Sequence, residues 1–439
     1  MGVILHFTAK EYEKNWPQIL AIVIGGLAGL SNGLLFSWSS PFLIKITQDK
    51  VNYDITEQEG SLFNTIQPIA LMIACPIFSK LSDVLGRKRT LLLIVIPQID
   101  GCLFATLPTY IGEVANPIVR GIWGNAVAIS LFLGEFLINV LGSYLGVTTT
   151  SWVCLPISVL FFILFWFMPE SPYYYIMKGK EQEAKNSLKF LKRIKNIDEI
   201  FENCKYAVER QLSESGTWGD LIKIKSNRKA LFAGVFLRLS QQMAGMSVFL
   251  TYTQFIFQKS GNNMSHEEAS IVFMGFAVIL NLFAVIFVVK RFGRIFCYTV
   301  SMVTTSGVLY AMAAYFYIDG NTSIDVSYVK WIPLSCMMSY LLFASIGISV
   351  IPTLMLGELY SASIKSKAMT ILIIIFGMGN FLTTTIFYYL NTLFGLYAPF
   401  LLFAISNTVC AVLSRYIIPE TKGKTLEEIQ QMLKGELKN

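Results

Sequence analysis

The sequence has little charge and almost no histidine. Of its 439 residues only 14% are charged (35 Lys and Arg, 28 Asp and Glu), and two are histidines, His6 and His266. An average globular protein has about 25% charged residues, which keep its surface wet. The sequence also lacks a Cys-x-x-Cys pair and any cluster of carboxylates. We therefore expect no enzyme activity, no metal and no cofactor.

Hydrophobic residues dominate the composition. Hydrophobic residues make up 54% of the chain and include 33 Phe. A helix needs about 20 apolar residues to cross the hydrocarbon core of a bilayer. Eleven segments meet this requirement: 17–43, 60–81, 90–111, 121–145, 151–168, 229–257, 268–289, 295–318, 331–356, 368–391 and 394–418. The composition predicts an all-α polytopic protein in the lipid bilayer.

Basic residues gather in the loops. Thirteen of the 35 Lys and Arg fall between Lys178 and Lys229, and a tight cluster occupies Arg87–Arg89. Short basic loops face the cytoplasm. The first sixteen residues carry both charge signs before any apolar run, unlike a signal peptide. We expect both termini in the cytoplasm, and no nucleic-acid partner because no soluble basic face exists.

The polar stretch between the fifth and sixth spans has its own pattern. Apolar side chains recur there every three or four residues, at Leu188, Leu191, Ile194, Ile197 and Phe201. This spacing predicts amphipathic helices on the cytoplasmic face of the membrane.

Three short motifs occur twice in the same order. The first copies are Leu85-Gly86-Arg87-Lys88, Gly112-Glu113 and Pro169-Glu170-Ser171. The corresponding second copies are Phe292-Gly293-Arg294-Ile295, Gly357-Glu358 and Pro419-Glu420-Thr421. Parallel repeats of this kind indicate a transporter built from two halves. The predicted domains are a tail (1–16), a first helix bundle (17–172), a helical linker (173–228), a six-helix bundle (229–418) and a second tail (419–439).

The first half is short. Its Gly-Arg and Gly-Glu motifs lie 26 residues apart, against 64 in the second half. Arg87–Arg89 and Arg120 both favour the cytoplasm, yet only the span Thr90–Ile111 separates them. Asp100 inside that span would cost about 3 kcal/mol in lipid. We predict that about one span and a loop are missing here; natural variation in loop length is the alternative.

This gap has two expected consequences. The segment Thr90–Ile111 either dips in and out of the membrane around Asp100 or forces one basic loop to the outside. A bundle that lacks one of six helices cannot rock around a sealed site. We therefore predict that the 439-residue form is deficient in transport.

With these motifs the chain resembles the sugar porter family of the major facilitator superfamily, and within it the facilitated trehalose and hexose transporters of insects. Further matches are Trp38-Ser39-Ser40-Pro41, Gln241-Gln242 with Gly245, and Lys422-Gly423 after the second Pro-Glu-Thr. The resemblance implies two pseudo-symmetric bundles, normally with twelve spans. It also implies facilitative transport of trehalose or a hexose by a plasma-membrane monomer, with alternating access around a midplane site.

The resemblance also implies where sugar binds. The candidate contacts are Gln241, Gln242, Ser247, Thr251, Thr353 and Asn380. Amides suit a polyol because each offers two donors and an acceptor, and Gln241 lies about 18 Å into its span. The alternative is that these amides only cross-link helices. Ser247 and Thr353 replace an Asn and a Trp of the family, so the identity of the sugar stays open.

Charged residues at span ends imply a gate. The candidates are Arg87, Lys88, Glu113, Arg120, Glu170, Arg291, Arg294, Glu358, Lys365 and Glu420. Relatives form inter-helix ion pairs there that hold the inner gate shut. Simple positive-inside topology would explain the basic residues but not the glutamates at matched positions.

Other functions and modifications stay open. Glu135 and Arg238 lie inside spans, where an ionisable group indicates function. Proton-coupled symport through Glu135 is an alternative to uniport, although the first span contains no Asp or Glu. A non-transporting sugar sensor is another. Asn263-Met264-Ser265 and Asn321-Thr322-Ser323 are glycosylation sequons in loops expected outside the cell.

Overall fold

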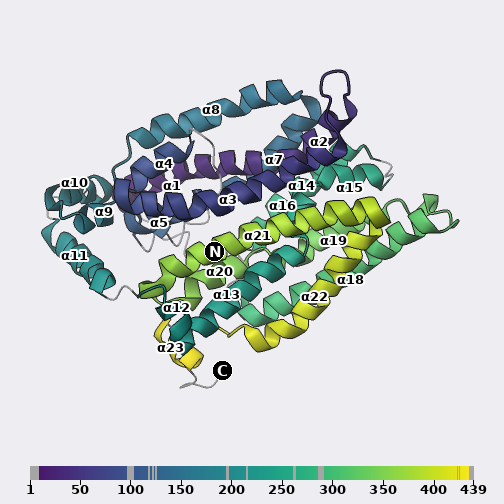
Figure 1. Cartoon of the computed structure of the whole chain (residues 1–439). Coiled ribbons are helices and arrows are strands. Elements are labelled where there is room, and N and C mark those ends of the chain that lie inside the picture. Colours follow the sequence, from purple (N-terminus) through teal and green to yellow (C-terminus); the bar gives the residue numbers. More distant parts are fainter. Residues whose placement is uncertain are drawn as a thin grey trace. The chain divides into compact units, whose positions relative to one another are not determined.

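The computed structural model describes residues 9–95, 103–116, 119–120, 123, 126–193, 197–213, 216–260, 264–284, 291–422, 424 and 426–434. Within these ranges every regular element is a helix (Figure 1). The predicted all-α fold is confirmed.

The chain divides into two compact units that exchange segments. Unit 1 comprises Met1–Leu35, Ile73–Gly134 and Thr148–Ser215, and unit 2 comprises Phe36–Met72, Glu135–Val147 and Gly216–Asn439. Two long helices, α3 (Glu57–Leu85) and α7 (Ala126–Tyr144), are divided between the units, whereas α1 (Ala9–Phe36) has only Phe36 in unit 2.

Unit 1 is built around a single apolar core. Besides its parts of α1, α3 and α7, its helices are α4 (Arg87–Val95), α5 (Leu103–Val114), α8 (Val147–Trp166), α9 (Pro172–Met177), α10 (Glu181–Lys192) and α11 (Asp198–Ser213). Leu91, Tyr110 and Phe165, from α4, α5 and α8, are fully buried in that core. The other face of α8 exposes Trp152 and Ile163, as expected for a lipid-facing helix.

The predicted span Thr90–Ile111 is corrected by the structure, which has α4 and α5 in its place. Their described parts have nine and twelve residues, which corresponds to about 14 and 18 Å of helix. Arg87, at the start of α4, contacts Glu113, near the end of α5. The start of α4 and the end of α5 therefore lie on the same side, as expected of a segment that enters the membrane and returns. Asp100 lies outside the described residues.

The linker is amphipathic, as predicted. Helices α10 and α11 bury Leu188, Leu191, Ile197 and Phe201, whereas Ile194 lies outside the described residues. Lys185 bonds Asp198 on the exposed side at 2.7 Å. That hydrogen bond and the lysine charge hold the pKa of the Asp198 carboxyl below its ordinary value.

The remaining described helices belong to unit 2. They are α2 (Ser39–Gln48), α12 (Asp220–Lys223), α13 (Lys225–Met243), α14 (Met246–Thr251), α15 (Thr253–Lys259), α16 (His266–Phe283), α18 (Arg294–Asn321), α19 (Ile332–Ile346), α20 (Ile351–Leu359), α21 (Ala362–Phe394), α22 (Tyr397–Ile417) and α23 (Leu426–Lys434), with a 3-10 turn at Ser327–Val329. Helices α18 and α22 run side by side (Figure 1), tied by Ser306 Oγ donating to Ala404 O at 3.0 Å.

Nine helices in the described part of the chain are long and apolar enough to cross a membrane. They are Asn15–Gln48, Glu57–Leu85, Ala126–Tyr144, Val147–Trp166, His266–Phe283, Arg294–Asn321, Ile332–Leu359, Ile364–Phe394 and Tyr397–Ile417. The predicted span 229–257 is divided among α13, α14 and α15. The chain is a multi-pass membrane protein.

Candidate functional site

Two helices of unit 2 are interrupted within their apolar segments. Helix α13 ends at Met243 and α14 begins at Met246, with Gly245 between them at φ +86°. A Cβ on Gly245 would lie 2.8 Å from Phe403 Cδ2, so conformation and space both require glycine. The second break separates α19 from α20 at residues 347–350. Interrupted helices free backbone groups, which transporters use to bind substrates.

The side-chain amide of Gln241 links α13 to the break between α19 and α20. Gln241 Nε2 donates to the carbonyl of Ile348 at 3.0 Å, and the N–H of Ile348 donates to Ser301 Oγ at 3.2 Å. Backbone groups that lose their helical partners in a membrane must be satisfied in this way. Gln241 is thus placed at a fixed position beside the α19–α20 break.

Gln242 and Ser247 form a second pair across the α13–α14 break. Ser247 Oγ donates to Gln242 Oε1 at 2.6 Å, and Gln242 is only 2% exposed. Thr251 instead bonds its own helix, donating to Ser247 O at 2.9 Å. The structure therefore brings three of the predicted sugar contacts together and turns Thr251 back to the backbone.

Helix α21 adds a further amide. A Cβ on Gly379 would lie 2.9 Å from Gln242 Cγ, so α13 and α21 approach closely here. Asn380 is 4% exposed, and its Oδ1 has no hydrogen-bond partner in the described part of the chain. Thr353 is exposed on α20, and none of these contacts reaches it. We call Gln241, Gln242 and Asn380, which lie on the neighbouring helices α13 and α21, the amide cluster. Side-chain amides of this kind can bind a polyol by hydrogen bonds.

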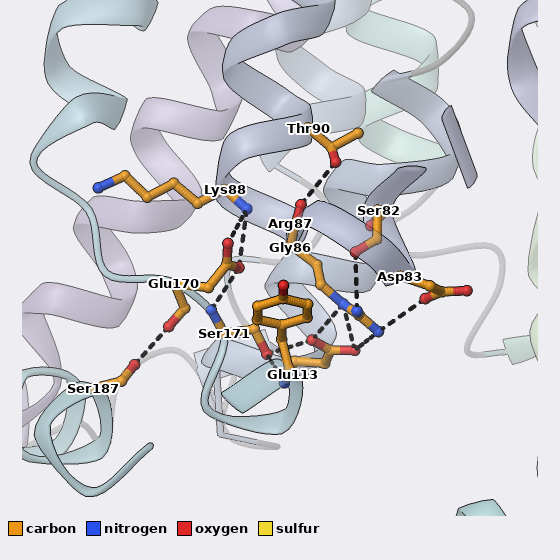
Figure 2. Close-up of polar contacts among 11 residues, drawn as sticks. Ser82, Asp83, Gly86, Arg87, Lys88, Thr90, Glu113, Glu170, Ser171 and Ser187 are labelled. Carbon is orange, nitrogen blue, oxygen red and sulfur yellow. Dashed lines mark hydrogen bonds and ion pairs between the residues drawn. The ribbon is translucent and has the colours of Figure 1, made fainter. Parts of the chain in front are cut away.

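The first set of motifs forms one network in unit 1 (Figure 2). Arg87 donates from Nε and Nη2 to Glu113 Oε1 at 3.2 and 3.1 Å, and its Nη2 lies 3.4 Å from Asp83. Ser171 Oγ donates to the other oxygen of Glu113. The start of α4, the end of α5 and the segment before α9 are therefore held together by one carboxylate.

Glu170 caps the start of α4. Its carboxylate accepts the N–H of Lys88 at 3.0 and 3.1 Å and that of Ser171 at 2.9 Å. A negative charge at a helix N-terminus is favourable. Gly86 leaves the space for it, since a Cβ there would lie 2.2 Å from Glu170 Oε2. Lys88 joins the network through its backbone N–H, and its side-chain charge also interacts with Glu170.

The second set of motifs builds the same arrangement in unit 2. Arg294 Nη2 donates to Glu358 Oε1 at 3.0 Å, and Thr421 Oγ1 donates to Glu358 Oε2 at 2.5 Å. Glu420 accepts the N–H groups of Arg294 and Ile295 at 2.9 and 3.2 Å. Burial alone would raise the pKa of the Glu420 carboxyl, but these backbone N–H groups hold the pKa below its ordinary value.

The remaining predicted charges bond to backbone carbonyls. Arg120 Nη1 donates to Gly112 O at 3.1 Å, and Lys365 Nζ donates to Gly357 O at 3.2 Å. Arg291 contributes its carbonyl, which accepts Lys422 Nζ at 2.7 Å. The repeated motifs thus correspond residue by residue, and each network ties helix ends within a single unit.

Sequence reasoning missed one buried polar cluster. Asn139 in α7 accepts from Ser40 Oγ and Ser270 Oγ, both at 2.8 Å, and donates to Ser37 Oγ at 3.1 Å. An asparagine in an apolar span was the available signal. Glu135, one turn earlier, is 2% exposed and gives its backbone carbonyl to Asn139.

The two sequons differ in what the structure describes. Asn321 is the last residue of α18 and is exposed, so it is accessible for glycosylation. Asn263 lies outside the described residues.

Fold and site together define a multi-pass membrane protein with two motif repeats. The family model for "Sugar (and other) transporter" matches residues 99–433, and the chain belongs to this family. The chain is 29% identical over 449 aligned residues to the facilitated trehalose transporter Tret1 of Bombyx mori, covering 95% of this chain and 87% of the relative. It is 28% identical to Tret1 of Drosophila willistoni, covering 96% and 52%. The chain spans about half the length of most of these curated relatives.

Solved structures establish the major facilitator fold. The proton:xylose symporter XylE bound to 6-bromo-6-deoxy-D-glucose superposes with a TM-score of 0.72 at 18% identity, covering 95% of this chain and 100% of XylE. The inward-open xylose transporter XylE from E. coli gives 0.73 at 17% identity, covering 94% and 98%. The predicted fold class and family resemblance are confirmed.

Proposed function

We propose that this chain is a facilitative sugar transporter of the plasma membrane by ancestry, with trehalose or a hexose as substrate. Substrate binds near the bilayer midplane, and access alternates between the two faces of the membrane. The termini lie in the cytoplasm and the protein acts as a monomer. The family assignment and the substrates named for the insect relatives support this proposal.

One observation carries the proposal. Gln241 contacts the carbonyl of Ile348, so a buried amide bridges two interrupted helices inside an apolar bundle. Gln242 and Asn380 lie on the adjoining helices α13 and α21. An uncharged polyol requires many donors and acceptors in a dry site, and this cluster supplies them.

We assign the two carboxylate networks to conformational control. Glu113 and Glu358 each join the ends of separate helices through an arginine. A single exposed ion pair contributes about 0–1 kcal/mol, but a network biases an equilibrium between two states. The networks would hold each unit's inner end rigid, and loosening one would shift the inward and outward populations.

Uniport is favoured over proton coupling. No Asp or Glu occurs between Pro17 and Ile44, the first span, in which the resemblance to the family's symporters implies a carboxylate. The buried Glu135 keeps proton symport as the alternative. The short helices α4 and α5 favour a second role for this form, as a non-transporting sugar sensor.

Ligand binding tests the assignment of the amide cluster. Gln241→Ala and Asn380→Ala should each weaken binding of glucose or trehalose by roughly two- to tenfold, because each removes a direct hydrogen bond. Equilibrium binding to the purified full chain in nanodiscs measures this without requiring transport. Asn407→Ala is the matched control, since that buried amide of α22 bonds Thr305 at 3.1 Å. Unchanged affinity in both site variants would refute the assignment.

A further inference from the structure

Arg238 places a positive charge beside the amide cluster. It lies in α13, three residues before Gln241, and α21 runs alongside in parallel register. A Cβ on Gly234 would lie 3.1 Å from Leu372 Cδ1. About two turns later along both helices, Gln242 faces Gly379. Arg238 faces Phe376 between these two contacts, with its guanidinium carbon 5.1 Å from the ring centroid.

The surroundings of Arg238 leave its charge without an anion. Nη1 donates to Gln241 Oε1 at 3.0 Å, and the Phe376 ring lies against the guanidinium. Nε is buried without a hydrogen-bond partner, and the ion pairs described for this chain include none to Arg238. An amide oxygen and a ring face compensate a guanidinium in lipid only in part, because burying a charge requires a hydrogen-bonded counter-charge.

An unsatisfied acceptor lies on the opposite helix. Asn380 follows Phe376 by one turn of α21, and its Oδ1 is buried without a partner in the described ranges. The two helices therefore present an unpaired guanidinium nitrogen and an unpaired amide oxygen on adjoining turns. A ligand that carries both a carboxylate and hydroxyl groups satisfies both.

We propose that the amide cluster takes a sugar acid, whose carboxylate pairs with Arg238 and whose hydroxyls bond Gln241, Gln242 and Asn380. This inference rests on the proposed function and extends its substrate class from neutral sugars to anionic ones. A planar guanidinium binds a carboxylate through two parallel hydrogen bonds, which gives the site both charge and orientation selectivity.

A matched pair of ligands tests the inference. Glucose and glucuronate differ only at C6, which is a hydroxymethyl group in one and a carboxylate in the other. Equilibrium binding of both is measured on the purified full chain in nanodiscs, with Arg238→Gln, Arg238→Lys and the control Arg228→Gln. Arg228 is exposed near the start of the same helix. We expect glucuronate to bind more tightly than glucose.

The variants then show whether Arg238 causes the preference for glucuronate over glucose. Arg238→Gln should weaken glucuronate binding at least about tenfold, and by a larger factor than it weakens glucose binding, because only glucuronate loses a charge pair. Arg238→Lys should fall between, because it keeps the charge but loses the planar fork. Glucose binding as tightly as glucuronate, or glucuronate affinity unchanged in Arg238→Gln, would overturn the inference but leave the proposed function standing. If neither ligand bound, both would fail.

Discussion

At the scale of residues, the two motif glutamates in each unit bond to different kinds of donor. Glu113 and Glu358 pair with arginines, whereas Glu170 and Glu420 accept backbone N–H groups at the starts of α4 and α18. The sequence motifs predicted which charges would matter, because glutamates recur at matched positions. They could not predict that the backbone N–H of Lys88 also bonds Glu170, since capping depends on the approach of a distant segment.

Charge reversal at Glu358 tests the role of its network. Glu358→Lys should leave substrate affinity nearly intact but shift the carrier toward one facing state, since it breaks the contacts to Arg294 and Thr421. Exofacial and endofacial cysteine labelling reports the populations. Glu183→Lys, at an exposed site on α10, is the control. Equal labelling of variant and parent would mean that Glu358 only marks topology.

At the scale of elements, apolar runs predicted most helices but not their breaks. The span 229–257 contains α13, α14 and α15 because Gly245 adopts positive φ against Phe403, a tertiary contact. The segment 90–111 contains enough apolar residues for one span, yet Arg87 and Glu113 draw its two ends together. Composition alone does not distinguish a crossing helix from two short ones.

Asn139 is expected to be a main stabilising contact of unit 2. Asn139→Ala leaves the hydroxyls of Ser37, Ser40 and Ser270 without this partner, and each buried loss costs about 1–3 kcal/mol. We expect the thermal midpoint in detergent to fall by at least about 4 °C. Asn407→Ala, which loses a single side-chain bond, should lower it less. Equal shifts in the two variants would contradict this role.

At the scale of the whole molecule, the two motif repeats do not yield two equal bundles. Four of the nine helices long enough to cross lie before residue 216, and five follow His266. The span and loop that the motif spacing predicts to be missing from the first half stay a prediction. The domain boundaries at residues 16, 172, 228 and 418 stay predictions. The sequence could not anticipate that α3 and α7 are each divided between the units, because that depends on which helix ends pack together.

The account as a whole holds that this chain keeps a sugar site but lacks the helices needed to carry the ligand across. Uptake of radiolabelled glucose, trehalose and glucuronate by oocytes expressing the 439-residue form tests this most directly, with surface protein quantified by biotinylation. A chain carrying the relative's residues between Val95 and Leu103 is the matched control. We predict no saturable uptake by the 439-residue form and measurable uptake by the extended one. Saturable uptake by the 439-residue form, at a rate comparable to the extended chain, would contradict the account.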